Sequence, residues 1–412
     1  MGSIIRPITA LLLSAAILLA GNGLEGVLLP LRGSLQGFGE IEIGLIGSAY
    51  NAGLMVGCLV CPRILGRVGH IRAFAVFTSI ATISPLIEAI WVTPPVWWVF
   101  RALTGICIAG VMNAVESWLT TVATNANRGQ VMSAYTIINF GSLTIGQQLI
   151  NVGDLGGSAL FSLVAILFTL AAVPLALTLT PHPAPPREPH LRIGQLYRVS
   201  PAAVAGSFGA GFANGAFWAL GAVYARESGL PLHLIPIFLS LVVLGGALAQ
   251  WPMGRISDRL DRRGVIAALC LGAATSELVL LSLGKEEVTS KLVVAALFGF
   301  CALPVYWVSF AHANDLAEPE EAVDVSSSLL MLYAVAAVGG PLLAAVLMRI
   351  GGPAALFVHT AWVHVVIALF VIYRITRRAP LPPQLRVSYD SLPKGNTPAG
   401  LEHATAPEVS RP

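Results

Sequence analysis

Apolar runs of about 20 residues restrict the fold of this chain more than any other feature of its sequence. The first extends from Ile8 to Leu31 and contains one charged residue, Glu25. A helix needs about 20 apolar residues to cross a bilayer. Because lipid offers no hydrogen-bond partners to the backbone, each run must pair its own backbone groups as a helix. We therefore predict an all-α polytopic membrane protein.

The number of such runs gives the expected number of spans. A scan on this basis predicts twelve transmembrane helices. They are expected at 7–31, 41–65, 71–92, 95–122, 129–152, 157–181, 201–225, 232–256, 263–284, 291–315, 323–350 and 353–376.

Composition excludes other classes of protein. Of the 412 residues, 56% are hydrophobic and only 11% are charged, whereas soluble domains have about 25% charged residues. The net charge of +3 provides no dense basic face, which argues against nucleic-acid binding. The sequence has no nucleophile–base pair, zinc-protease motif or Gly-rich phosphate loop, so we expect neither an enzyme nor a cofactor.

Metal binding is not expected either. Cys58 and Cys61 have the spacing of a redox or metal pair, but they lie in an apolar run and are expected to be inert thiols. His312, His359 and His364 are scattered, and the last two do not share a helix face.

Basic residues set the orientation. With the N-terminus in the cytoplasm, most of the 24 Lys and Arg residues fall on the cytoplasmic side. We therefore expect both termini to be cytoplasmic, in a bacterial inner membrane. The Pro-rich segment 182–199 is interpreted as a cytoplasmic linker between six-helix bundles at 1–181 and 200–378. Residues 379–412 are expected to form a disordered tail.

The two predicted bundles repeat one another. A shift of 192 residues aligns 22–67 with the second half without a gap, and it pairs Asn22 with Asn214 and Arg67 with Arg259. Parallel repeats of this kind predict pseudo-symmetric bundles around a cavity near the bilayer midplane, which rocking would expose to each side in turn.

A loop motif adds a family resemblance. The run from Gly254 to Arg263 (GRISDRLDRR) resembles the G-x-L-x-D-R-x-G-R-R loop of major facilitator superfamily transporters, with Asp261 at the second Gly. The stretch from Arg101 to Gly105 resembles the R-x-x-x-G motif of that family. The runs GCLVCPRILGRVGHIRAF and ESWLTTVATNANRG further resemble its poorly characterised YcaD-like bacterial branch.

The resemblance implies a cytoplasmic latch in each half. In the second half, Asp258 and Arg259 would pair with Asp315. The first-half copy lacks both expected acids, and we hypothesise that Glu116, one helical turn deeper, pairs with Arg63 or Arg67.

Charges within the spans point to a coupling site, because each costs about 3 kcal/mol at a helix centre. Glu25 lies three residues after Asn22 and therefore on the same helix face. Arg101 is its expected counter-charge, and these three residues are the predicted proton and substrate site. Glu88 is expected to reach the outer membrane interface, and Glu277 to lie in a peripheral span.

Other polar and aromatic residues are weaker candidates for the cavity wall, each with helix–helix packing as the alternative. They are Tyr50, Asn51, Gln147, Asn214, Trp218, Gln250, Tyr306 and Trp307. Gly53 and Gly57 form a small-residue face on the second span, which is expected to contact the eleventh span, marked by Gly339 and Gly340.

Together these features predict a secondary transporter that moves a small organic solute by alternating access, coupled to protons. We expect a monomer in contact with lipid. The alternative is a non-transporting relative that acts as a sensor or assembly factor. The direction of transport stays open.

Overall fold

The computed structural model describes residues 2–123, 128–177, 193–317, 321–379, 381–382, 386–389 and 397, and the described residues are helical without strands. The helices are α1 (Gly2–Leu35), α2 (Glu40–Val68), α3 (His70–Ile90), α4 (Pro94–Val122), α5 (Arg128–Gln148), α6 (Ala159–Leu170), α7 (Ala172–Ala176), α8 (Ile193–Val199), α9 (Pro201–Glu227), α10 (Ile235–Arg259), α11 (Arg262–Ser282), α12 (Val288–Ala302), α13 (Pro304–Asn314), α14 (Ala322–Gly351) and α15 (Ala355–Arg377). Short 3₁₀ helices cover Leu149–Val152 and Leu232–Leu234.

The described helices confirm a polytopic membrane fold. Ten segments are long and apolar enough to cross a bilayer. Helices α5 and α9 occupy the ranges of two further predicted spans but are not among these ten. Helix α5 is less apolar, whereas α9 is rich in Gly and Ala, and most of its residues are buried by its neighbours rather than facing lipid. The count of twelve therefore remains a prediction.

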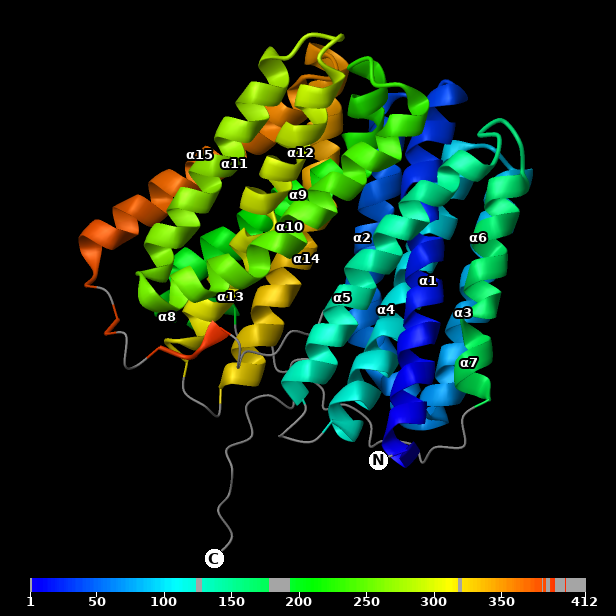
Figure 1. Ribbon diagram of the computed structural model, residues 1–412, viewed down its shortest axis with the longest axis horizontal. Helices are drawn as coiled ribbons and strands as arrows, with labels where there is room; N and C mark the ends of the chain where they lie inside the picture. Colours follow the sequence, from blue (N-terminus) through cyan, green and yellow to red (C-terminus); the bar gives the residue numbers. More distant parts are fainter. Residues whose placement is uncertain are drawn as a thin grey trace, which may run out of the picture.

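The helices form two groups that lie side by side (Figure 1). Helices α1 to α7 lie on one side and α8 to α15 on the other, and the two groups meet through α1, α2 and α5 against α9, α10 and α14. The end of the bundle that holds the N-terminus is the one predicted to face the cytoplasm, and the described tail residues also lie there.

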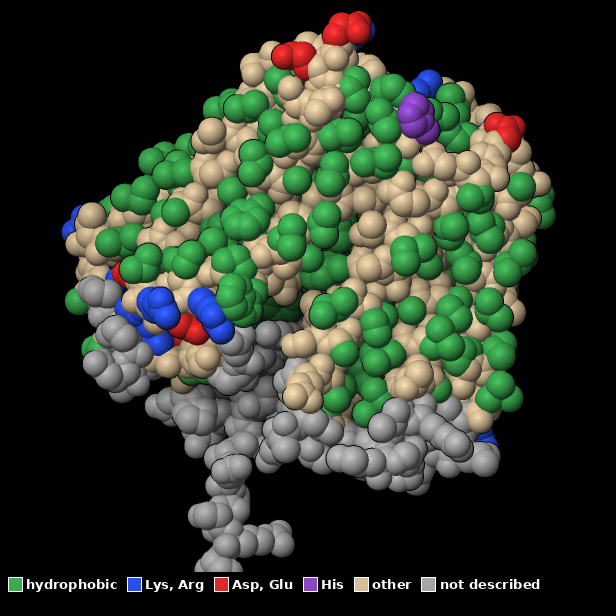
Figure 2. All heavy atoms as spheres, viewed as in Figure 1, with side chains coloured by type: hydrophobic (Ala, Val, Ile, Leu, Met, Phe, Trp, Pro, Cys, Tyr) green, Lys and Arg blue, Asp and Glu red, His purple; other side chains and the backbone are tan. Residues whose placement is uncertain are grey.

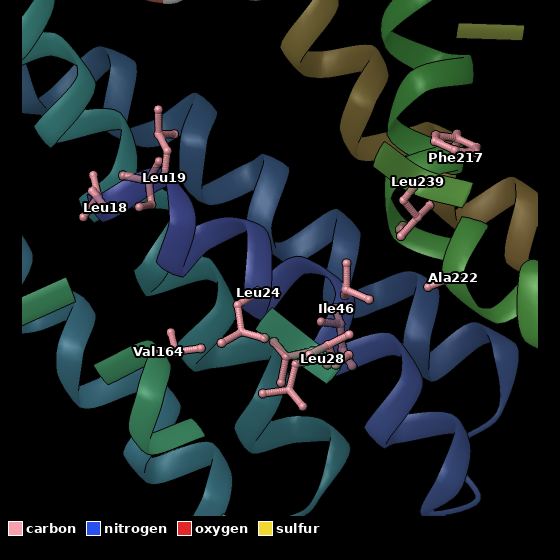
Figure 3. Packing of buried hydrophobic residues seen from close by; sticks show 14 of the residues in the cluster. Leu18, Leu19, Leu24, Leu28, Ile46, Val164, Phe217, Ala222 and Leu239 are labelled. Carbon is pink, nitrogen blue, oxygen red and sulfur yellow. The ribbon is translucent and has the colours of Figure 1, made fainter. Parts of the chain in front are cut away.

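Contacts between the groups are concentrated toward the end opposite the N-terminus. There the Arg226 guanidinium donates to Ser34 Oγ at 2.6 Å, and Ser48 Oγ donates to the Val338 carbonyl at 2.8 Å. A buried hydrophobic cluster continues across the same boundary. Figure 3 shows part of it, including Leu28 of α1 with Ile46 of α2 and, from the other group, Leu239 of α10.

Hydrophobic side chains cover the middle of the surface in Figure 2, while Lys and Arg gather at the lower edge and Asp and Glu at the top. This distribution fits a molecule whose flanks face lipid and whose ends face water.

Two predicted irregular segments are partly ordered. Residues 182–192 of the predicted linker lie outside the described residues, but 193–199 form α8. The tail was predicted to be disordered, yet Tyr389 and Thr397 are buried against the helices. Other parts of 379–412 lie outside the described residues, including 383–385, 390–396 and 398–412.

Candidate functional site

A buried ion pair between Glu25 and Arg101 joins α1 to α4. The Arg101 Nη1 group donates to Glu25 Oε2, and the two residues are 6% and 0% exposed. The guanidinium also lies 4.1 Å from the ring centre of Tyr50 on α2, a cation–π contact. Three helices of the first group thus meet at one charged point.

Asn22 shares the helix face of Glu25, as its spacing predicts. Its side chain interacts with the Tyr50 hydroxyl, while its Oδ1 atom is buried and has no hydrogen-bond donor among the described residues. A buried acceptor without a donor is costly, and here it lies beside a cavity where a ligand could supply one.

That cavity has a volume of about 210 Å³ and lies between the two helix groups. Its wall includes seven of the predicted site residues: Asn22, Glu25, Tyr50, Asn51, Arg101, Gln147 and Trp218. Six come from the first group, and Trp218 of α9 supplies an aromatic face from the second. The cavity is therefore lined unevenly, with both its charges on one side.

Gln147 also links the two groups across the cavity. Ser240 Oγ on α10 donates to Gln147 Oε1 at 2.9 Å and accepts from Gln148 Nε2 at 2.7 Å. These bonds tie α5 to α10 next to the cavity.

The other predicted wall residues lie elsewhere. Asn214 donates to the Tyr333 hydroxyl at 3.4 Å, and Tyr306 packs against Trp307 and Tyr333 in an aromatic cluster of the second group. Gln250 lines a separate hollow of about 600 Å³ between α5 and α10, which Tyr389 of the tail also lines.

Glu88 corrects one expectation. It was predicted to reach the membrane interface but is 0% exposed. The chain turns back at Trp91–Thr93, and Trp97 of α4 donates its indole N–H to the Glu88 carbonyl at 3.0 Å. The Glu88 carboxyl group interacts with Glu25 and Arg101. The distance of a residue from its helix end in the sequence does not reveal such contacts with other helices.

The second-half latch forms through a different arginine. Arg262, rather than the expected Arg259, pairs with Asp315 through Nε at 2.7 Å and with Asp258 through Nη2 at 3.0 Å. Arg259 is exposed. Burial raises the pKa of Asp315, and hydrogen bonds and attraction from Arg262 only partly offset this. The loop motif thus predicted the cluster but not the pairing within it.

The tail completes this cluster. The Val387 N–H donates to Asp315 Oδ1 at 2.9 Å, and the Tyr389 N–H donates to Asp258 Oδ1 at 3.0 Å. Arg262 in turn donates to the Val387 carbonyl.

In the first half, Glu116 is fully buried and bound by partners that the sequence did not predict. The Tyr135 hydroxyl donates to Oε1 at 2.9 Å, and the Thr397 N–H and hydroxyl donate to Oε2 at 2.9 and 2.6 Å. Arg63 and Arg67 are exposed. Their pairing with Glu116 stays a prediction.

A second buried pair, between a glutamate and a histidine, lies outside the lining of the 210 Å³ cavity. His364 Nδ1 of α15 is 3.1 Å from Glu277 Oε2 of α11, and both residues are 0% exposed. The sequence does not predict this pair, because a contact between two helices far apart in the chain leaves no pattern in the local sequence. No cluster of metal-ligating side chains is present among the described residues.

Comparison with known proteins agrees with this arrangement. The chain is 26% identical over 363 residues to an uncharacterized MFS-type transporter of Yersinia pestis (strain Pestoides F), covering 87% of this chain and 93% of that protein. It is also 26% identical over 388 residues to the uncharacterized MFS-type transporter YcaD of Salmonella newport (strain SL254), covering 93% and 99%.

Solved structures share the fold. A variant of the nucleoside transporter NupG superposes with a TM-score of 0.78 at 11% identity, over 89% of this chain and 99% of that one. A bacterial homolog of the human lysosomal transporter Spinster gives a TM-score of 0.69 at 14% identity, over 90% and 95%. The Major Facilitator Superfamily model matches residues 11–341 and 203–394. The chain therefore belongs to the Major Facilitator Superfamily of membrane transporters.

Proposed function

We propose that this protein is a proton-coupled secondary transporter that moves a small organic solute across the bacterial inner membrane by alternating access. The observation that carries the proposal is the 210 Å³ cavity between the helix groups, with a buried acid–arginine pair in its wall. A buried ion pair is weak evidence for stability, since apolar residues of similar volume often do as well. A role in binding explains its presence better.

In this proposal, the six-helix units at 1–181 and 200–378 rock as bodies about the cavity. Contacts such as Arg226–Ser34 close one end, and the 600 Å³ hollow between α5 and α10 lies on the path to the other. Solute and proton compete for Glu25, and Arg101 compensates its charge when the proton is absent. Asn22, Asn51 and Gln147 supply neutral hydrogen-bonding groups to the solute.

The first experiment identifies a solute. Purified protein is screened for thermal stabilisation against metabolites and drugs, because a ligand of the folded state raises its stability by RT ln(1 + [L]/Kd). The solute found is then loaded into proteoliposomes, and its flux is measured with and without an imposed pH gradient.

Flux that responds to the gradient in the native protein and is lost in Glu25→Gln supports the proposal. Glu277→Gln serves as the matched control, because it alters a buried acid outside the cavity wall. Binding without flux would instead indicate the sensor function, and full proton coupling in Glu25→Gln would refute the role of Glu25.

A further inference from the structure

Three charged groups share the buried site at the wall of the cavity, although only two are visible from it. Glu25 and Arg101 line the cavity, and Glu88 of α3 lies behind them. All three are buried, at 0%, 6% and 0% exposure. Two carboxyl groups therefore face one guanidinium.

Arg101 satisfies only one of the four carboxyl oxygens. It donates to Glu25 Oε2. Glu25 Oε1 and both oxygens of Glu88 are buried and accept no hydrogen bond from a donor among the described residues. The two carboxyl groups nevertheless interact side chain to side chain. Two carboxylate anions cannot hydrogen-bond to each other, because neither has a donor.

Within the described part of the chain, no second cation is placed to balance the second carboxylate. The charged groups that act on Glu88 are Glu25 from α1 and Arg101 from α4. Helices α6 and α7 also pack against α3, and their sequences contain no titratable residue. Helix α2 packs against α3 too, and its Arg63 and Arg67 are exposed. An unpaired carboxylate in such a site is strongly unfavourable, and adjacent carboxyl groups do not both ionise.

We propose that Glu25 and Glu88 share one proton and with Arg101 form a proton-binding site of net charge zero. The protonated carboxyl donates the hydrogen bond that the other accepts, which satisfies two of the three unpartnered oxygens. Release of this proton leaves two carboxylates against one guanidinium, with a net charge of −1. Because the pair titrates as a unit, the proton belongs to both residues rather than to either.

This site deepens the transport function proposed above and rests on it only for its role in coupling. Glu88 becomes the proton-binding partner behind the cavity wall, while Glu25 faces the solute. A change of charge on Glu88 therefore reaches the solute through Glu25 and Arg101.

The test is infrared spectroscopy of the full-length protein in lipid at neutral pH, which detects the carbonyl stretch of a protonated carboxyl group. The Glu88 signal is defined as the native spectrum minus that of Glu88→Gln. We expect a protonated band in this difference. We also expect the band to be lost when the same subtraction is made in a Glu25→Gln background, because the one remaining carboxyl group then balances Arg101 as a carboxylate.

A Glu277→Gln background is the control, since that acid pairs with His364 elsewhere, and the Glu88 band should not move there. Glu88→Asp tests folding and should retain a protonated band. Absence of the band would show that Glu88 is ionised and overturn the proposal. A band that ignores Glu25→Gln would also overturn it, because Glu88 would then hold its proton alone.

The spectrum needs no solute, so the site and the transport function can fail separately. A shared-proton band together with flux that ignores the pH gradient leaves the site standing and refutes coupling. Flux driven by the pH gradient without the band supports proton coupling and refutes the shared-proton site.

Discussion

At the scale of single residues, the polar chemistry of the cavity is concentrated in the first helix group. The aligned repeat places Phe217 opposite Glu25, and Phe217 packs against Phe238, Phe298 and Phe357 in an aromatic cluster. The same backbone position therefore carries a charge in one half and fills a core in the other. In the proposed transport function, the first half would supply the charged groups for the solute and the second half mainly apolar packing.

Removing Arg101 alone should be more harmful than removing the whole pair. Arg101→Met leaves the buried Glu25 carboxylate without its counter-charge. Breaking a buried pair in this way costs about 3–5 kcal/mol of folding free energy. We expect a clear fall in thermal stability in detergent, and recovery of most of it in the double variant Arg101→Met/Glu25→Gln. A double variant no more stable than Arg101→Met would contradict this account of the pair.

Asp261, which lies outside the membrane-spanning segments, should make the stability of the fold depend on pH. Burial alone would raise its pKa, but hydrogen bonds and attraction from Arg263 outweigh this and hold the pKa below its ordinary value of 3.8. A carboxyl with a lowered pKa stabilises the fold above its unfolded pKa and loses that contribution as pH falls through the folded value.

Asp261 also accepts the Arg263 N–H at the start of α11, so it is an N-cap. Asp261→Asn keeps a capping oxygen but removes the charge, and Asp261→Ala should cost about 0.5–2 kcal/mol as a lost cap. In unfolding titrations, the difference between native protein and Asp261→Asn should be present at neutral pH and shrink in acid below pH 3.8. A difference that grows in acid would reverse the sign and refute this reading.

At the scale of helices, small residues set how closely α2 approaches α4. A Cβ atom added to Gly53 would lie 2.0 Å from the Ala102 carbonyl oxygen, and one added to Gly105 would lie 2.2 Å from that of Tyr50. The second and eleventh spans do meet, as α2 and α14, but Gly53 and Gly57 are not at that contact, because both face α4. Glycines 44 and 47 of the same helix instead face α14 and α9.

The close crossing predicts a strong effect of one methyl group. Gly53→Ala should force α2 and α4 apart and destabilise the protein by about 1–3 kcal/mol, as overpacking does. Gly264→Ala on α11 is the matched control, because its added Cβ meets no atom within 4 Å. There the better helix propensity of Ala favours a small gain. Equal melting temperatures for the two variants would show that the crossing tolerates a methyl group.

Much of the helix arrangement was predictable from the sequence, and the predictions that failed did so for physical reasons. Hydrophobic runs give helices because lipid forces backbone pairing within each segment, and the Glu25–Arg101 pair followed from the cost of isolated buried charge. Glu88 was misplaced because its side chain is buried against Glu25 and Arg101 of other helices. The Arg262–Asp315 pair depends on where the turn from α10 to α11 places each arginine, and a loop motif does not encode that.

At the scale of the whole molecule, the described contacts close one end of the cavity. Arg226–Ser34 and Ser48–Val338 join the two groups there. We expect Arg226→Ala to weaken this closure, since it removes the 2.6 Å bond to Ser34, and a reporter cysteine at Asn51 in the cavity wall should then react faster with a membrane-impermeant thiol reagent. The comparison is Asn51→Cys with native Arg226 against Asn51→Cys with Arg226→Ala. Equal labelling rates would show that the bond does not hold this end closed.

The tail binds residues of both helix groups, Glu116 through Thr397 and the Asp258–Arg262–Asp315 cluster through Val387 and Tyr389. A segment that binds only one of two conformations raises the population of that conformation. Each 1.4 kcal/mol of its binding free energy changes the ratio of the two populations tenfold. In the proposed rocking cycle, tail contacts on both helix groups would therefore favour the conformation in which the tail is bound. The resting population of the two conformations would then be set in part by a few residues that belong to no transmembrane helix.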